Sequence, residues 1–206
     1  MNHFDLGARE WDNDPKRILR ANTVAQAIVA AVPLNRQMAA LEYGCGTGLL
    51  SFALQPHLGP ITLADSSAGM LEVLSEKIAA AGITNMAPLW LDLATQTLPG
   101  EHFDIIYTLM ALHHIPDTTA ILGSFHTLLN PGGHLCIADL DQEDGSFHTH
   151  ESGFDGHHGF ERTALTRQLS QAGFDHIRFT TCFEMTKNGR VYPIFLATAK
   201  SVKRDA

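Results

Sequence analysis

Apolar positions along the chain fall into two patterns, short continuous runs and helical spacings. Continuous runs are typical of buried strands, and they occur at 38–41, 61–64, 87–91, 103–108, 134–138, 177–183 and 191–199. Other segments repeat apolar residues every three or four positions, which is typical of amphipathic helices. Helices are expected at 15–32, 49–54, 68–81, 118–128 and 161–172. Strands and helices therefore alternate, with short connections between them.

This alternation predicts an α/β fold built on a parallel sheet that helices cover on both faces. Asn188-Gly189 lies between the last two runs and is typical of a hairpin, so the final strand should run antiparallel to its neighbour. We expect one domain over residues 1–206. Its parts are an N-terminal arm and helix (1–33), a core (38–138), a loop (139–160), and a C-terminal helix and hairpin (161–199).

Composition narrows the class of protein. The chain is 45% hydrophobic and 17% charged, which is typical of a globular protein. Its net charge of -8 argues against binding to nucleic acid or to an anionic membrane. No run is long enough to span a membrane, and no signal-peptide pattern is present. Cys45, Cys136 and Cys182 form no CxxC pair, so we expect buried thiols and a cytoplasmic protein.

A glycine-dense turn, Gly44-Cys45-Gly46-Thr47-Gly48, connects the first predicted strand to the next helix. Three glycines in five residues let the backbone turn sharply and leave no side chain between it and a ligand. The helix that follows offers unpaired N–H groups at its N-terminus. Several nucleotide-binding families use such a turn, so the turn alone does not identify the ligand.

Acidic residues stand at or near the ends of the first three strands, at Glu42, Asp65 and Asp92. Ligands of parallel α/β sheets bind at the carboxyl ends of the strands. Asp65 follows the turn by about twenty residues, the placement of a ribose-binding acid, although it could also cap the next helix. Leu49 replaces the last glycine of a dinucleotide fingerprint, which disfavours an NAD-dependent oxidoreductase. A nucleoside with a compact zwitterionic end fits the pattern better.

Further motifs follow the turn in a fixed order over residues 38–140. The set comprises Leu41-Glu42-x-Gly44-Cys45-Gly46-Thr47-Gly48, Asp65 with Met70, Asp92-Leu93, Phe103-Asp104-Ile105-Ile106, Ala111-Leu112-His113-His114-Ile115 and Leu128-Leu129-Asn130-Pro131-Gly132-Gly133. Together these motifs resemble the class I S-adenosylmethionine-dependent methyltransferases. The resemblance extends more loosely to the final strand pair. It implies a Rossmann-like, doubly wound sheet of seven mostly parallel strands with an antiparallel C-terminal strand, and S-adenosyl-L-methionine as cofactor.

The resemblance also implies cofactor-binding roles. The residues concerned are Glu42, Gly44, Cys45, Gly46, Gly48, Asp65, Ser66, Met70, Asp92, Leu93, Thr108 and Leu109. The glycines would admit the methionine part of the cofactor, and Glu42 would bind its ammonium group through water. Asp65 would bind the ribose and Asp92 the adenine amino group, with Met70 and Leu93 on either side of the ring. Met70 could equally be ordinary helix packing.

The implied reaction is an in-line attack on the sulfonium methyl by a nucleophilic atom of the acceptor. The protein then mainly orients the reactants and excludes water. A general base is needed only when the nucleophile arrives protonated. His113 and His114 are the candidate catalytic residues, and the alternative is that they only shape the loop.

A second group of histidines lies in the long loop, at His148, His150, His157 and His158. Such spacing can supply metal ligands, but no supporting second-shell pattern is visible. We therefore expect a polar lid on the acceptor side and no metal site. Phe4 and Trp11 in the N-terminal arm could pack on the domain or form a flap over the ligand.

Missing motifs limit the acceptor. The fourth strand is not followed by an Asn/Asp-Pro-Pro-Tyr/Phe box, and the chain has no Pro-Cys nucleophile and no basic stripe. We therefore expect a small-molecule acceptor, neutral or cationic, rather than nucleic acid. The alternatives are a protein methyltransferase and a non-catalytic cofactor-binding regulator or partner subunit.

Overall fold

Seven strands form a single sheet in the part of the chain that the computed structural model describes, residues 3–93, 95–148 and 154–202. The strands are β1 (Ala40–Tyr43), β2 (Ile61–Asp65), β3 (Met86–Trp90), β4 (Phe103–Leu109), β5 (Leu129–Leu140), β6 (Phe174–Lys187) and β7 (Arg190–Ser201). Their order across the sheet is β3-β2-β1-β4-β5-β7-β6. β7 runs antiparallel to both of its neighbours, β5 and β6, and the other pairs are parallel. The predicted fold class is confirmed.

The main helices are α2 (Pro15–Ala31), α3 (Leu49–Leu54), α4 (Ala68–Ala81), α5 (Thr118–Leu128) and α6 (Arg162–Gln171). Four of them, α2, α4, α5 and α6, are capped by side chains that accept a backbone N–H of the first turn, from Asp14, Ser67, Asp117 and Glu161. Such caps satisfy donors that have no partner within the helix. Among the described residues, no helix is long and apolar enough to cross a membrane.

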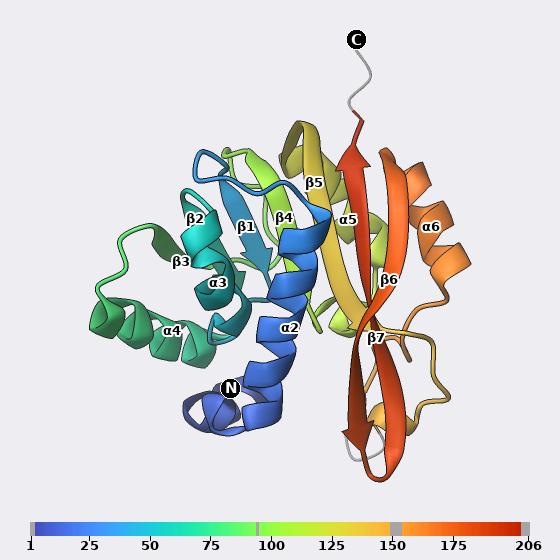
Figure 1. The fold of residues 1–206 in the computed structure, drawn as a ribbon, viewed down its shortest axis with the longest axis horizontal. Helices are drawn as coiled ribbons and strands as arrows, with labels where there is room; N and C mark the ends of the chain where they lie inside the picture. Colours follow the sequence, from blue (N-terminus) through green and yellow to red (C-terminus); the bar gives the residue numbers. More distant parts are fainter. Residues whose placement is uncertain (1–2, 94, 149–153, 203–206) are drawn as a thin grey trace.

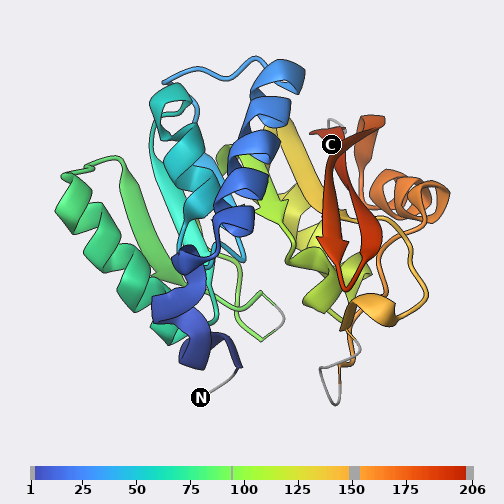
Figure 2. The same cartoon turned by 60° about the horizontal axis from the view of Figure 1, so that its bottom comes forward.

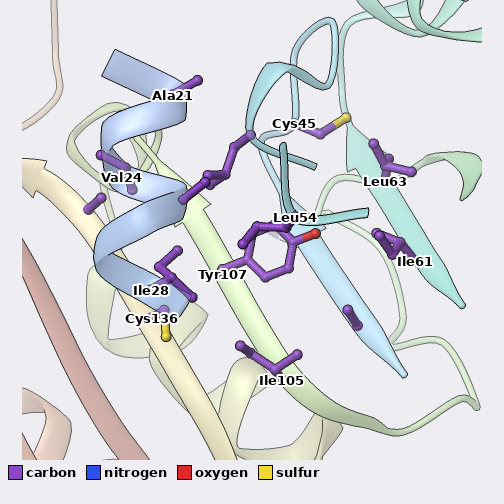
Figure 3. Close-up of a cluster of buried hydrophobic side chains, with 14 of the residues drawn as sticks. Ala21, Val24, Ile28, Cys45, Leu54, Ile61, Leu63, Ile105, Tyr107 and Cys136 are labelled. Carbon is purple, nitrogen blue, oxygen red and sulfur yellow. The ribbon is translucent and has the colours of Figure 1, made fainter. Parts of the chain in front are cut away.

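Two hydrophobic clusters cover the two faces of the sheet. Figure 3 shows part of the first, where Val24 and Ile28 of α2 face Tyr107 and Ile105 of β4. The apolar residues of α5 and α6 belong to the second cluster, and Figure 1 shows α5 behind the sheet. Each strand supplies both clusters, because successive side chains point to opposite faces.

Two strand boundaries differ from the sequence prediction. β1 spans Ala40–Tyr43, two residues later than the predicted run at both ends, so Glu42 lies one residue before the end of the strand, near the end as expected. β5 contains the turn expected around Gly132, where its register with β4 shifts and the backbone φ is +76°. It also continues to Leu140, so Asp139 belongs to the strand and not to the loop. Hydrogen bonding to β7 over these residues extends the strand.

The N-terminal arm is folded rather than extended. It forms a short helix, α1 (His3–Gly7), and a 3-10 helix, η1 (Ala8–Asn13). Both contact α4, and Figure 2 shows the arm beside that helix. Arg9 reaches Glu72 and Glu76 of α4 at 3.0 Å. These ion pairs are exposed and contribute little to stability. The arm therefore packs on the domain near the start of α4.

Candidate active site

The sheet reverses its strand order between β1 and β4, and the site lies at the carboxyl ends of these two strands. β1 leads into the glycine turn, and β4 leads to a 3-10 helix, η3 (Leu112–His114). The two segments touch, because a Cβ placed on Gly44 would lie 2.5 Å from the Cβ of Ala111. Only glycine fits at that contact, and Gly44 also has a φ of +70°. The turn and the segment after β4 therefore form one wall.

The glycine turn is fastened to the end of β2. Asp65 accepts hydrogen bonds from the backbone N of Gly46 at 2.7 Å and of Ser67 at 2.8 Å. The carbonyl of Ala64 accepts the N–H groups of Gly44 and Cys45. Burial raises the pKa of Asp65, while its hydrogen bonds oppose that shift. The structure thus brings together the turn and the acid that the sequence assigned to ribose.

Glu42 lies behind the turn, with 2% of its surface exposed. Its carboxylate accepts the backbone N of Ser51 at 3.2 Å and also the Ser51 hydroxyl. That hydroxyl lies 2.7 Å from the Tyr107 hydroxyl. Burial raises the pKa of Glu42 to about 8. Glu42 is therefore mostly neutral at pH 7, and it organises the start of α3 from within the core.

The predicted adenine-binding residues lie at the ends of β2 and β3. Met70 is buried, and its Sδ lies 3.9 Å from the position of a Cβ on Gly46. Leu93 is also buried, and its N–H donates to the Tyr43 hydroxyl at 3.1 Å. Asp92 is partly exposed and accepts the hydroxyl of Thr95 at 3.0 Å. These three residues are grouped on the β2–β3 side of the turn.

The remaining cofactor candidates are nearby. Ser66 directly follows Asp65, and Thr108 and Leu109 end β4. The Thr108 hydroxyl is buried and has no hydrogen-bond partner among the described residues. Cys45 is buried, and burial raises the pKa of its thiol well above the usual value. This thiol therefore contributes packing rather than a nucleophile.

The N-terminal arm contacts this same region. Asp5 accepts the Ser67 hydroxyl at 2.6 Å and the backbone N of Gly69 at 3.1 Å. Asp12 accepts the Thr47 hydroxyl at 2.5 Å and pairs with Lys77 at 2.5 Å. The Lys77 ammonium also donates to the carbonyl of Thr47 at 2.7 Å. The arm therefore fixes the glycine turn from outside.

The aromatic residues of the arm extend this cover. The Nε1 of Trp11 lies 3.9 Å from a Cβ position on Gly46, and the Arg17 guanidinium stacks on the indole at 3.7 Å. Phe4 meets the ring of His114 edge-on, with centroids 5.4 Å apart. The arm packs on the domain, as one interpretation of the sequence had it, and it covers the glycine turn and the start of α4.

Three histidines gather beyond the end of β4. His113 and His114 come from η3, and His148 comes from the 3-10 helix η4 (Ser146–His148). One ring nitrogen from each histidine lies within 4.8 Å of the other two. Asp139 of β5 is fully buried, and its carboxylate lies 2.6 Å from Nδ1 of His113 and accepts the backbone N of His113 at 3.2 Å. His148 stacks on Phe154 at 3.9 Å.

The described loop histidines, His148, His157 and His158, do not form one cluster of possible metal ligands. His157 lies 3.0 Å from the carbonyl of Ile115, and His158 pairs with Glu143 at 3.5 Å. His150 lies outside the described residues. The hairpin of β6 and β7 holds η4 in place instead, through Ser146 and Tyr192, whose hydroxyls are 2.8 Å apart. His148 therefore joins the pair that follows β4.

Sequence reasoning missed several site residues. Asp139, Asp12 and Lys77 act across long sequence separations, and no local motif marks them. Arg20 of α2 is partly buried, its Nε has no partner among the described residues, and its Nη1 contacts the sulfur of Met185 at 3.0 Å. Burial, and then the nearby Arg17, lowers the pKa of Arg20 to about 10. The helical periodicity of α2 does mark Arg20 as a polar residue beside an apolar face.

A surface hollow lies at the other end of the sheet and is not the site. Its lining includes Gly59, Thr62 and Asn85, at the amino ends of β2 and β3. Those strand ends carry neither the glycine turn nor the acids. Ligands in this class of sheet bind at the carboxyl ends, so the histidine and glycine side is the candidate site.

Comparison with known proteins identifies the family. Residues 16–178 match the methyltransferase domain family. An uncharacterised methyltransferase of Mycobacterium tuberculosis is 37% identical over 110 residues, covering 52% of this chain and 53% of that protein. A ubiquinone biosynthesis O-methyltransferase of Xanthomonas campestris is 32% identical over 146 residues, covering 69% of this chain and 60% of that protein.

A similar fold occurs in the solved structure of Haemonchus contortus phosphoethanolamine N-methyltransferase 2 in complex with S-adenosyl-L-methionine. The TM-score is 0.75 at 14% identity, covering 98% of this chain and 61% of that one. The chain belongs to the family of class I S-adenosylmethionine-dependent methyltransferases. Its matches span about half the length of the first curated relatives, 42% and 53% of those proteins.

Proposed function

We propose that this protein transfers a methyl group from S-adenosyl-L-methionine to a small-molecule acceptor. The observation that carries the proposal is the hydrogen bond between Gly46 and Asp65 at the point where the strand order reverses. It joins a turn that admits a ligand to a carboxylate that can accept ribose hydroxyls. The histidines beyond β4 stand on the side left for the acceptor.

The turn fits the cofactor for a steric reason. Side chains at Gly44 and Gly48 would meet Ala111 and Leu74 at 2.5 and 2.6 Å, and both glycines have positive φ values. We assign the methionine part of the cofactor to this turn, with Cys45 and Gly46 contributing backbone. We assign the ribose to Asp65 and Ser66. S-adenosylmethionine supplies a methyl group that is already activated by its sulfonium sulfur. The acceptor's nucleophile attacks the carbon of this methyl group, in line with the carbon–sulfur bond.

The adenine ring is assigned to the β2–β3 side of the turn. Met70 and Leu93 supply apolar surface there, and Asp92 offers a carboxylate to the adenine amino group. Thr108 and Leu109 complete the wall beside the reacting sulfur. Glu42 acts from behind the turn by holding Ser51, so its contact with the cofactor's ammonium group is indirect.

The chain itself supplies orientation, exclusion of water and a proton acceptor. The arm, through Phe4 and Trp11, keeps solvent from the cofactor side. Aligning two reactants can remove about 7–11 kcal/mol of the barrier. The carboxylate of Asp139 fixes the ring orientation of His113, as a carboxylate does for a catalytic histidine. When the acceptor arrives protonated, His113 or His114 is the candidate base.

The name of one relative supports a small molecule as the acceptor. One relative is named as an O-methyltransferase of ubiquinone biosynthesis, so that relative acts in the synthesis of a small molecule. The net charge of -8 disfavours nucleic acid. A cytoplasmic location, expected from the cysteines, stays part of the proposal.

The test is direct. Isotope-labelled S-adenosylmethionine is incubated with the protein and separate pools of small metabolites, proteins and nucleic acids, while S-adenosylhomocysteine binding is measured by calorimetry. We expect binding and label transfer to the metabolite pool. If the label appears only in the protein pool, the acceptor is a protein and not a small molecule. Binding without transfer to any pool would favour a regulator.

A further inference from the structure

The cluster of His113, His114 and His148 is larger than methyl transfer from a sulfonium requires. A proton acceptor needs one imidazole, and here three imidazoles from two segments converge. One nitrogen from each lies within 4.8 Å of the other two. The rings of His113 and His114 have centroids 4.2 Å apart, and those of His113 and His148 are 5.2 Å apart. This spacing is close to that of imidazoles that share one ion.

The carboxylate behind His113 is the second observation. The Oδ1 of Asp139 lies 2.6 Å from Nδ1 of His113 inside the core, where both residues are at most 1% exposed. Metal-binding histidines usually donate their other ring N–H to such a carboxylate, which fixes the tautomer and increases the basicity of the ligand nitrogen. Asp139 therefore leaves Nε2 of His113 as the nitrogen that faces a ligand.

The surroundings of the cluster are apolar and closed. Phe147 packs edge-on against His148 at 4.8 Å, and Phe154 stacks on the same ring. His148 is 6% exposed, while His114 is only partly buried. An apolar shell around three nitrogen ligands restricts solvent access and strengthens the electrostatic effect of an ion. The partial exposure at His114 leaves one open side.

We propose that His113, His114 and His148 bind a divalent transition-metal ion, for which zinc is the best chemical match. Three histidines and one open position form a recurrent zinc coordination set in enzymes. Zinc-bound nitrogens lie about 2.0–2.1 Å from the ion, so neighbouring ligand atoms come within roughly 3.4 Å of one another. Binding therefore requires the ring nitrogens, now within 4.8 Å of one another, to move closer together.

The open position assigns a chemical class to the acceptor, and this step rests on the proposed function. A hydroxyl or thiol of the acceptor binds the ion and loses its proton to solvent, because the ion lowers the acceptor's pKa. The resulting anion attacks the sulfonium methyl, the carbon–sulfur bond breaks, and its electrons stay on the sulfur. The products are the methylated acceptor and neutral S-adenosylhomocysteine. In this state the histidines are ligands, and the ion replaces His113 or His114 as the group that activates the nucleophile.

The inference departs from the sequence-based expectation of no metal. The spacing of the loop histidines pointed to His148, His150, His157 and His158. In the fold, His157 and His158 contact other residues. His148 instead lies beside His113 and His114, which follow β4. The proposed ligand set therefore depends on tertiary structure.

The experiment measures metal binding without any acceptor. Protein freed of its affinity tag and stripped with a chelator is titrated with Zn²⁺ by calorimetry, and with Co²⁺ by absorption spectroscopy. We expect one ion per chain and a cobalt spectrum of a four-coordinate site with three nitrogen ligands and one water. His148→Ala should weaken zinc binding at least 100-fold, and Asp139→Asn about 10–100-fold. His102→Ala, at an exposed loop histidine, is the matched control and should change nothing.

Two results would overturn the proposal. One is wild-type protein that binds zinc no more tightly than the His148→Ala variant does. The other is zinc binding that is lost in His157→Ala but retained in His148→Ala. Circular dichroism checks that each variant is folded, and His114→Gln repeats the test if His148→Ala is not. S-adenosylhomocysteine titrated into the same samples tests the proposed function separately. If the protein binds S-adenosylhomocysteine but not zinc, the metal proposal fails and the proposed cofactor binding stands.

Discussion

The carboxylate of Asp65 accepts the backbone N–H of Gly46 at 2.7 Å. This bond crosses from the end of β2 to the turn that follows β1, so it links two neighbouring strand ends. The second carboxylate oxygen accepts the N–H of Ser67, the cap of α4. Asp65 therefore supports both the turn and the capping residue of α4, and it is the proposed ribose ligand.

Replacement of Asp65 should weaken cofactor binding. We expect Asp65→Ala to raise the Kd of S-adenosylhomocysteine roughly 100-fold or more, because each charge-assisted hydrogen bond contributes about 1.5–3 kcal/mol. Calorimetry measures the Kd, and Asp175→Ala, at a partly exposed carboxylate on β6, is the control. An unchanged Kd would contradict the ribose assignment.

The arm should stabilise the glycine turn through Asp12. This carboxylate bonds to Thr47 and pairs with Lys77. We expect Asp12→Ala to raise the Kd of S-adenosylhomocysteine about 3–10-fold, the equivalent of roughly 0.7–1.4 kcal/mol. Glu10→Ala changes an exposed acid of the same arm and should have no effect. If the two variants bind S-adenosylhomocysteine with the same Kd, the arm contributes only packing and does not support cofactor binding.

Glu42 should make the protein less stable as the pH rises. Its pKa in the fold is about 8 against an ordinary value of 4.5, so the folded chain retains a proton that the unfolded chain loses. The stabilisation is complete below the unfolded pKa and is lost as the pH rises through the folded pKa. Glu42→Gln is neutral at every pH.

The free energy of unfolding, measured in urea at pH 6 and pH 9, tests this effect. Relative to wild type, we expect Glu42→Gln to gain about 2–3 kcal/mol between the two pH values. Glu101→Gln, at an exposed acid, should follow the wild type. Parallel pH profiles for wild type and Glu42→Gln would show that burial does not shift this carboxyl group.

His113 should affect turnover more than cofactor binding. It follows β4 on the side proposed for the acceptor, and both His113 and its partner Asp139 are buried. We expect His113→Ala to lower kcat about 100-fold, within the range for acid–base catalysis, and to change the Kd of S-adenosylhomocysteine less than threefold. A large change in that Kd with unchanged kcat would move His113 to the cofactor side.

The sequence predicted the elements whose signals are local. Asp14, Ser67 and Asp117 each cap a helix that begins where the sequence predicted, because a cap needs only the next few residues. The glycine turn and Asp65 were also predicted as parts of one site, since a parallel sheet places consecutive strand ends along one edge.

The contacts that the sequence did not predict join distant segments. His113 meets Asp139 because β5 continues further than its apolar run suggested, which depends on pairing with β7. Glu42 faces Ser51 only after the turn folds α3 back over β1. The position of His148 depends on the β6–β7 hairpin. No local pattern encodes these tertiary contacts.

The contact between Phe4 and His114 has a kinetic consequence. Phe4 belongs to the segment that covers the glycine turn. Its ring centroid lies 5.4 Å from that of His114, on the side proposed for the acceptor. We expect the cofactor to bind before this contact forms and the acceptor to bind afterwards. Initial-rate measurements with both substrates varied should give an ordered mechanism in which S-adenosylmethionine binds first and S-adenosylhomocysteine leaves last.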